Sequence, residues 1–185
     1  MYGSHNSMTC YKPKNFIHKI LQIFSKTQNL SIPEQIHEGC RVFDLRVRLD
    51  CDYNLIACHG LCEYKVDVMS VISLLEKHKC YYRIVLEDTL RKTDKGDLDH
   101  LKQIFISDDD YPYCMYVCDK KHWDKTSNTY CKLSPNYLRE SNCHKESKWP
   151  FIPRLCLNKY KKNKKSDSLN KNKKTVFWYD YVEIK

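Results

Sequence analysis

Residues 40–49 read CRVFDLRVRL, and this stretch decides the class of fold. Apolar and charged residues take alternate positions along it, which is the period of a β-strand whose side chains point to two opposite faces. The two alternating sets are Phe43, Leu45 and Val47 against Asp44 and Arg46. The stretch therefore predicts a strand with one apolar face and a charged pair on the other.

Helical and extended patterns alternate on both sides of this strand. Apolar residues at helical spacing predict an amphipathic helix over 14–26, and the capping-box spacing of Ser31 and Glu34 predicts a short helix over 31–39. Further patterns predict strands at 54–60, 83–88, 113–119 and 175–184, helices near 68–75 and 98–105, and an irregular excursion over 120–150. This order is typical of an α/β protein with mostly parallel strands.

Length and composition are those of one globular domain. The 185 residues are 42% hydrophobic and 30% charged. A chain of this length and composition forms a hydrophobic core without disulfides or structural metals, so we expect a single domain over 1–185. No apolar run approaches the roughly 20 residues of a membrane span, and the start MYGSHNSMTC lacks the apolar core of a signal peptide. Eleven cysteines without an export signal favour reduced thiols. We therefore expect a cytoplasmic protein.

The net charge of +9 is concentrated in one late segment. Residues 145–174 hold eleven Lys or Arg and two Asp or Glu, whereas the rest of the chain is balanced. Within it, residues 158–174 are of low complexity, which predicts a mobile segment. Such a segment favours an anionic membrane surface or a nucleic acid. Because only Tyr160 interrupts the lysine run as an aromatic, we expect no nucleic-acid partner.

Two histidines lie near glycines at predicted strand ends, where parallel α/β folds build their sites. His5, His59 and Arg46 together are what metal-free phosphodiester cleavage needs. One imidazole takes a proton from the attacking hydroxyl, the guanidinium neutralises the phosphate, and the other imidazole protonates the leaving oxygen. Taken alone, these residues favour a plainer interpretation: a frayed terminus, a turn histidine and an ordinary ion pair of Asp44 with Arg46.

The order of three sequence blocks favours the catalytic interpretation. GSHNSMT (3–9), EQIHEGCRVFDLRVR (34–48) and LIACHG (55–60) follow one another. They resemble the X region of phosphatidylinositol-specific phospholipases C, with a first histidine in G-[ST]-H-[DN]-[ST], a strand G-x-R-x-[FL]-[DE]-[IL]-[RD], and a second histidine in H-G. FWYDYVE (177–183) resembles a late strand of bacterial members, whose metal-independent branch is the most similar.

The resemblance implies a fold and a role for each matching residue. The fold is a compact, incomplete or distorted TIM-like (β/α) barrel with its site at the carboxyl ends of the strands. His5 is the general base on the inositol 2-hydroxyl, and Asp180 is the carboxylate that orients it. His59 is the general acid for the diacylglycerol oxygen, Arg46 clamps the phosphate, and Asp44 holds Arg46 or a histidine.

Two positions bear on a metal. Asn6 resembles the calcium-dependent eukaryotic branch, yet Arg46 stands where that branch has its second acid. Asn6, Asp44 and Glu87 could form a weak oxygen site for calcium. Since a guanidinium would repel the ion, we expect no cofactor, with calcium as the alternative. Glu87 and Arg154 are further candidates for contact with the substrate.

The resemblance implies cleavage of a phosphatidylinositol-type lipid by internal attack of the 2-hydroxyl, giving diacylglycerol and inositol cyclic phosphate. The basic segment 145–174 would contact an anionic membrane from outside, at about 1 kcal/mol for each basic residue near the surface. One alternative is a glycerophosphodiester phosphodiesterase, whose family expects an early H-R-[GN] motif and a carboxylate-bound metal. Another is a catalytically inactive phosphoinositide-binding module, which has no need of both proton-transfer groups.

Overall fold

The computed structural model describes residues 1–87, 95–119, 129–131, 138–142, 174–179 and 182. Asp180, Arg154 and almost all of the basic segment 145–174 lie outside the described residues, so what the sequence predicts for them stays a prediction.

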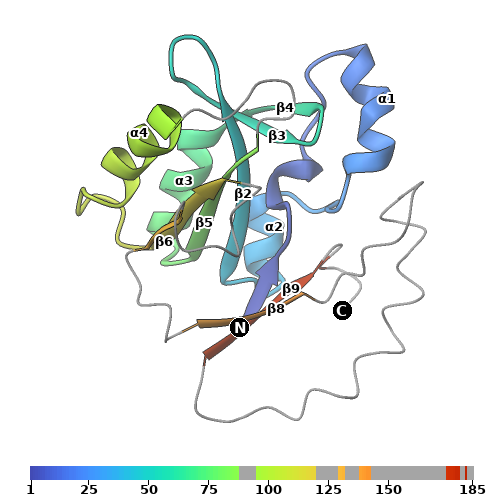
Figure 1. Ribbon diagram of the computed structural model, residues 1–185. Coiled ribbons are helices and arrows are strands. Elements are labelled where there is room, and N and C mark those ends of the chain that lie inside the picture. The colour runs from blue at the N-terminus through green and yellow to red at the C-terminus, as the bar shows by residue number, and fades with distance from the viewer. Residues whose placement is uncertain (88–94, 120–128, 132–137, 143–173, 180–181, 183–185) are drawn as a thin grey trace.

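A sheet built around one central strand organises the described part of the chain (Figure 1). Its path runs β7-β6-β5-β2-β1-β9-β8, and all neighbours from β6 to β8 are parallel. These strands are β1 Tyr2–Ser4, β2 Val42–Leu49, β5 Tyr81–Leu86, β6 Cys114–Asp119, β7 Thr129–Cys131, β8 Leu138–Asn142 and β9 Lys174–Tyr179. The predicted α/β class with mostly parallel strands is confirmed, whereas the predicted barrel is not. The described strands form an open path with β7 and β8 at its ends.

The strand order departs from the sequence-based expectation in two places. The strand predicted at 54–60 is not parallel: β3 (Leu55–His59) and β4 (Cys62–Asp67) form an antiparallel hairpin on β2. Gly60 turns this hairpin with a φ of 59°, a conformation that glycine adopts without strain. The region predicted to be irregular, 120–150, contains two short strands, β7 and β8. They pair with β6 and β9, and their own sequences show little of a strand pattern.

Capping side chains fix where three of the helices begin. α1 (Phe16–Ser25) starts at Asn15, whose side chain accepts from the His18 amide, and α2 (Ile32–His37) has the predicted capping box. Asp67 caps α3 (Val68–Lys77), and α4 (Lys95–Phe105) precedes β6. A short 3-10 helix, η1 (Ser7–Cys10), follows β1. Among the described residues, no helix is long and apolar enough to cross a bilayer.

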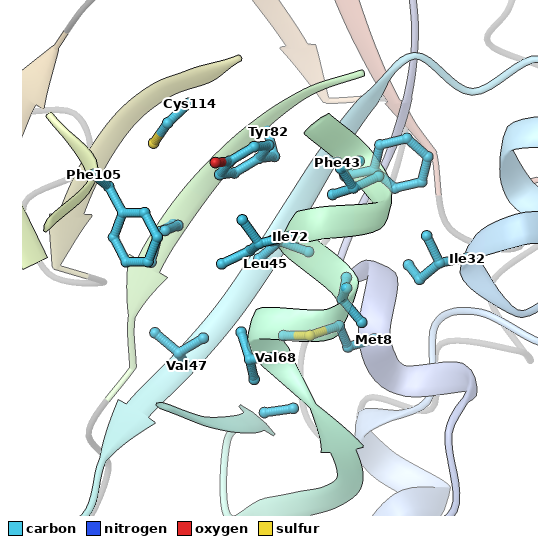
Figure 2. Close-up of a cluster of buried hydrophobic side chains, with 14 of the residues drawn as sticks. Met8, Ile32, Phe43, Leu45, Val47, Val68, Ile72, Tyr82, Phe105 and Cys114 are labelled. Carbon is cyan, nitrogen blue, oxygen red and sulfur yellow. The ribbon is translucent and has the colours of Figure 1, made fainter. Parts of the chain in front are cut away.

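The apolar face of β2 forms the centre of the hydrophobic core. Phe43, Leu45 and Val47 are fully buried in one cluster. Figure 2 shows Leu45 with Val68 and Ile72 of α3 beside it. The alternation read from residues 40–49 is therefore confirmed: one side of β2 packs against α3, which leaves the other side for charged residues.

Shortening the core face of β2 is expected to destabilise the fold. We expect Leu45→Ala to lower the free energy of unfolding by about 2–5 kcal/mol, because it removes buried methyl groups and leaves a cavity. Ile17→Ala, at a 66% exposed position, serves as the control and is expected to change it by no more than about 0.5 kcal/mol. Urea denaturation measures both, and equal effects would contradict the packing described here.

Candidate active site

The second face of β2 brings the candidate residues together at one end of the parallel strands. Asp44 and Arg46 point away from the core, and both are buried. His5 follows β1, His59 ends β3, and Glu87 follows β5. Because β1 and β5 flank β2 in parallel, the residues that follow them lie at the same end of the sheet.

Arg46 is the cation at the centre of this group. Its Nε donates to Asp44 Oδ2 at 3.2 Å, its Nη1 to Glu87 Oε2 at 3.0 Å, and its Nη2 to His5 Nε2 at 3.0 Å. Glu87 is held in turn by the Gly60 amide, which donates to Oε1 at 2.8 Å. The glycine of the predicted H-G motif therefore supports the carboxylate that holds Arg46.

Asp44 is held between two guanidinium groups. Arg83 of β5 is its direct partner in the β2–β5 register, and Arg83 Nε donates to Asp44 Oδ1 at 2.9 Å. Arg83 also donates to the Tyr116 hydroxyl at 2.9 Å and lies 4.0 Å from the centre of the Trp178 ring. The sequence analysis did not single out Arg83, and an arginine in the otherwise apolar run RIVL (83–86) was the signal that could have found it.

The hydrogen bonds of His5 fix where its proton lies. An arginine only donates, so the bond from Arg46 makes His5 Nε2 an acceptor. In the neutral imidazole the proton is then on Nδ1, which lies 3.1 Å from the Asn6 side-chain amide. Among the described residues Asn6 Oδ1 has no hydrogen-bond partner, and the amide nitrogen is the end placed toward His5. The two ends of an amide have nearly the same shape, so turning the amide over would place its oxygen against the His5 N–H.

The same amide reaches the second histidine. His59 Nε2 lies 3.3 Å from the Asn6 side chain, and His59 Nδ1 donates to the Ser25 carbonyl at 2.6 Å. If the Asn6 oxygen faces His59, it accepts a hydrogen bond from Nε2 only when both ring nitrogens of His59 are protonated. One amide thus lies between the candidate base and the candidate acid. A left-handed φ of 47° at Asn6 turns its backbone N–H to Asp44 Oδ2 at 3.1 Å.

Burial and charge keep His5 neutral. Burial, and next the nearby Arg46 guanidinium, hold the pKa of His5 well below its ordinary value. Burial alone would raise the pKa of Asp44, but Arg83 and Arg46 outweigh it and hold that pKa well below its usual range. Burial would also lower the pKa of Arg46, yet Asp44 and Glu87 raise it. The site therefore contains a lasting cation beside a neutral imidazole.

The two carboxylates of the oxygen set considered for calcium are already held by N–H donors, and Arg46 bridges Asp44 and Glu87. In the part of the chain that the structure describes, no three His, Cys, Asp or Glu residues are placed to hold a metal ion. A divalent cation between these carboxylates would have to displace a guanidinium.

The structure brings together most of the sequence-predicted site and adds a residue that the sequence did not indicate. The six residues that it brings together are His5, Asn6, Asp44, Arg46, His59 and Glu87. Asp180 lies outside the described residues, but Tyr179, the residue before it, is beside His5. The His5 amide donates to the Tyr179 carbonyl at 3.0 Å. Gln28 Nε2 donates to the carbonyls of His5 and Tyr179, and Gln28 Oε1 accepts from the Val182 amide.

A cavity opens next to His59. Its volume is about 170 Å³, and its lining comes from α1 and the β3–β4 turn: Leu21, Phe24, Ser25, His59, Gly60, Leu61 and Cys62. This lining is mainly apolar apart from the imidazole. The cavity therefore adjoins the candidate acid and not the candidate base.

Comparison with known proteins agrees with the sequence blocks. The chain matches no known family by its sequence profile. The human protein named PI-PLC X domain-containing protein 2 is 38% identical over 69 residues, which cover 35% of this chain and 23% of that protein. The chain resembles the X-domain family of phosphatidylinositol-specific phospholipases C. This X-domain likeness spans less than a quarter of the human relative's length.

Two solved structures extend the likeness to almost the whole chain. A phosphatidylinositol-specific phospholipase C from Listeria monocytogenes superposes with a TM-score of 0.60 at 14% identity, covering 98% of this chain and 87% of that one. One from S. aureus does so with a TM-score of 0.55 at 14% identity, covering 98% and 72%. At 14% identity the likeness shows the fold alone. Any catalytic activity of this chain follows only from the residues of its candidate site.

The depressed pKa of His5 predicts a pH-dependent stability. Between the pKa of His5 in the unfolded chain, about 6.5, and its lower value in the folded chain, only the unfolded state binds the proton. Stability is therefore expected to fall as the pH drops below about 6.5. Urea denaturation from pH 7.5 to about 5 should show a shallower loss in His5→Gln than in wild type. His37→Gln, at an exposed position, is the control, and equal slopes in wild type and His5→Gln would contradict a buried neutral His5.

Proposed function

We propose that this chain cleaves phosphatidylinositol-type lipids without a metal, by internal attack of the inositol 2-hydroxyl on the phosphorus. The observation that carries the proposal is the convergence of one guanidinium and two imidazoles around one amide side chain. Arg46 lies 3.0 Å from His5, and the Asn6 amide links His5 to His59. The X-domain likeness supports the same reaction class.

In the proposed reaction His5 is the base. Its neutral imidazole takes the proton of the 2-hydroxyl while that oxygen forms a bond to phosphorus. The bond from phosphorus to the diacylglycerol oxygen breaks, and protonated His59 gives its Nε2 proton to the leaving oxygen. The products are diacylglycerol and inositol cyclic phosphate, and the two histidines end with exchanged protonation states. Asp180 is proposed to orient His5, with the Gln28 contacts to Tyr179 and Val182 in support.

Arg46 is proposed to supply the positive charge that a metal supplies in other phosphodiesterases. Asp44 and Glu87 fix two edges of its guanidinium, and this preorganisation favours charge stabilisation in the transition state. Occupation of both carboxylates by Arg46 and other donors supports a reaction without calcium. The same arrangement disfavours a glycerophosphodiester phosphodiesterase, which expects a carboxylate-bound metal.

Two features of the proposal concern the rest of the chain. Six successive parallel strands, from β6 to β8, support an incomplete TIM-like barrel as the full fold. We further propose that the protein is cytoplasmic and binds peripherally to a membrane, with the basic segment 145–174 and Arg154 facing anionic headgroups.

Hydrolysis of phosphatidylinositol vesicles tests the proposal. Wild type is expected to release inositol cyclic phosphate in EDTA as well as in calcium, because Arg46 supplies the cation. His5→Ala should lower the rate of hydrolysis about 10²- to 10⁴-fold, the usual contribution of a general base. The exposed control His37→Ala should leave the rate unchanged. A 2-O-methyl inositol lipid should be inert, since it lacks the attacking hydroxyl.

Other outcomes would overturn particular parts. Activity only with calcium would make Asn6, Asp44 and Glu87 ligands and refute the metal-free mechanism. Normal turnover of the 2-O-methyl lipid would refute internal attack. Specific headgroup binding without any hydrolysis would identify an inactive phosphoinositide-binding module.

A further inference from the structure

The candidate acid His59 lies beyond the part of the β3–β4 hairpin that pairs with the rest of the sheet. The pairing of β3 with β2 runs from Leu55 to Ala57 and stops there. The pairing of β3 with β4 shifts its register between Ile56 and Cys58, immediately before His59. The ladder bonds of the sheet therefore do not reach this imidazole, and side chains have to place the turn that carries it.

Gly60, the residue after His59, is bound through both of its backbone polar groups. Its amide donates to Glu87 Oε1 at 2.8 Å, and its carbonyl accepts from Arg48 Nη2 at 2.7 Å. Glu87 also accepts from Arg46. The turn is thus clamped between a carboxylate and a guanidinium, and this clamp ties the place of His59 to that of Arg46.

Arg48 is itself fixed at its other arm. It lies on the same face of β2 as Asp44 and Arg46 and is 8% exposed. Its Nη1 donates to Glu63 Oε1 at 3.0 Å, while Lys14 Nζ pairs with Glu63 Oε2 at 2.7 Å. Burial would raise the pKa of Glu63, but Lys14 and Arg48 outweigh it and hold that pKa below its ordinary value. Glu63 therefore stays charged at neutral pH and anchors the guanidinium.

A guanidinium suits this place because it donates in a fixed, planar fork. From β2, Arg48 bonds a side chain of β4 and the carbonyl of the turn at once, which fixes the far end of the hairpin relative to β2 (Figure 1). His59 then meets the Ser25 carbonyl at 2.6 Å and the Asn6 amide at 3.3 Å. A displacement of the turn would break these two contacts of the imidazole.

We propose that Arg48 is a positioning residue for His59, which holds the Gly60 carbonyl so that the imidazole stays between Ser25 and Asn6. Arg48 acts through Gly60 and does not itself touch the substrate. The placement of the turn follows from the contacts alone. Its use in giving a proton to the leaving oxygen rests on the proposed function.

Nitrogen-15 spectra of the histidine side chains, recorded where His59 is neutral, test the placement without substrate. Since the Ser25 carbonyl only accepts, wild type is expected to show one tautomer with the proton on Nδ1. In Arg48→Met the loosened turn should move the His59 signals toward those of a mixture of tautomers. Lys14→Met removes the other partner of Glu63, at a side chain that is 55% exposed, and should leave His59 as in wild type.

Two substrates with different leaving groups test the use of this placement. A short-chain phosphatidylinositol below its micelle concentration needs a proton on its leaving alkoxide, whereas p-nitrophenyl inositol phosphate releases a stable phenolate without one. Arg48→Met is expected to lower kcat about 10- to 100-fold on the lipid and less than about threefold on the nitrophenyl ester. His59→Ala should show the same bias between the substrates, and Lys14→Met should hydrolyse both as wild type does.

A second variant guards against loss of the fold. Circular dichroism and urea denaturation establish whether each variant is folded. Arg48→Lys keeps a charge beside Glu63 without the planar fork. It should change the His59 spectrum in the same direction but less, and it takes the place of Arg48→Met if that variant does not fold.

Either measurement can overturn the proposal. An unchanged His59 spectrum in the folded Arg48 variant would do so, and so would an equal loss of rate on both substrates, because a purely structural role slows both alike. If wild type hydrolyses neither substrate but the Arg48 variant alters the His59 spectrum, the placement by Arg48 stands and the proposed function fails.

Discussion

The buried ion pair of Asp44 with Arg46 is the interaction on which the rest of the site depends. Both residues lie on one face of β2, whose opposite face is the centre of the core, so a single alternating strand fixes the site relative to the fold. Burying charges carries a large desolvation penalty, which is offset only when each charge is paired and its hydrogen bonds are made. Arg83 and Glu87 provide those pairs from β5 and its end. Close parallel pairing of β2 with β5 is thus a requirement of the charge network as well as of the core.

The same network keeps His5 neutral and links it to His59. Arg46 donates to His5 Nε2 and disfavours a second positive charge there, while Asn6 offers one amide to both imidazoles. The arrangement places a neutral His5 and the candidate acid His59 beside one side chain. Ser25 at the end of α1 fixes the other nitrogen of His59. The end of α1 and the pair of imidazoles are therefore parts of one connected structure.

Much of this could be predicted from the sequence because the signals are local. The alternation in β2, the capping box of α2 and the blocks around His5 and His59 are each written in a few consecutive residues. The parts that could not be predicted depend on contacts between distant positions. Arg83 meets Asp44 from 39 residues away and Gln28 meets Tyr179 from 151 residues away, so neither role has a local pattern. The antiparallel β3–β4 hairpin and the short strands β7 and β8 are likewise decided by tertiary pairing.

Nuclear magnetic resonance titration of the histidine side chains, labelled with ¹⁵N, tests the central claim that Arg46 and burial keep His5 neutral. The His5 signal is assigned by its loss in a His5 variant, and the spectrum itself reports whether each protein is folded. The account predicts that His5 of wild type has its proton on Nδ1 and stays neutral well below pH 6.5, the ordinary value. It also predicts that the pKa of His5 rises in Arg46→Gln, because the repelling cation is gone and Asp44 remains. A His5 that titrates at its ordinary value in both proteins would contradict the account.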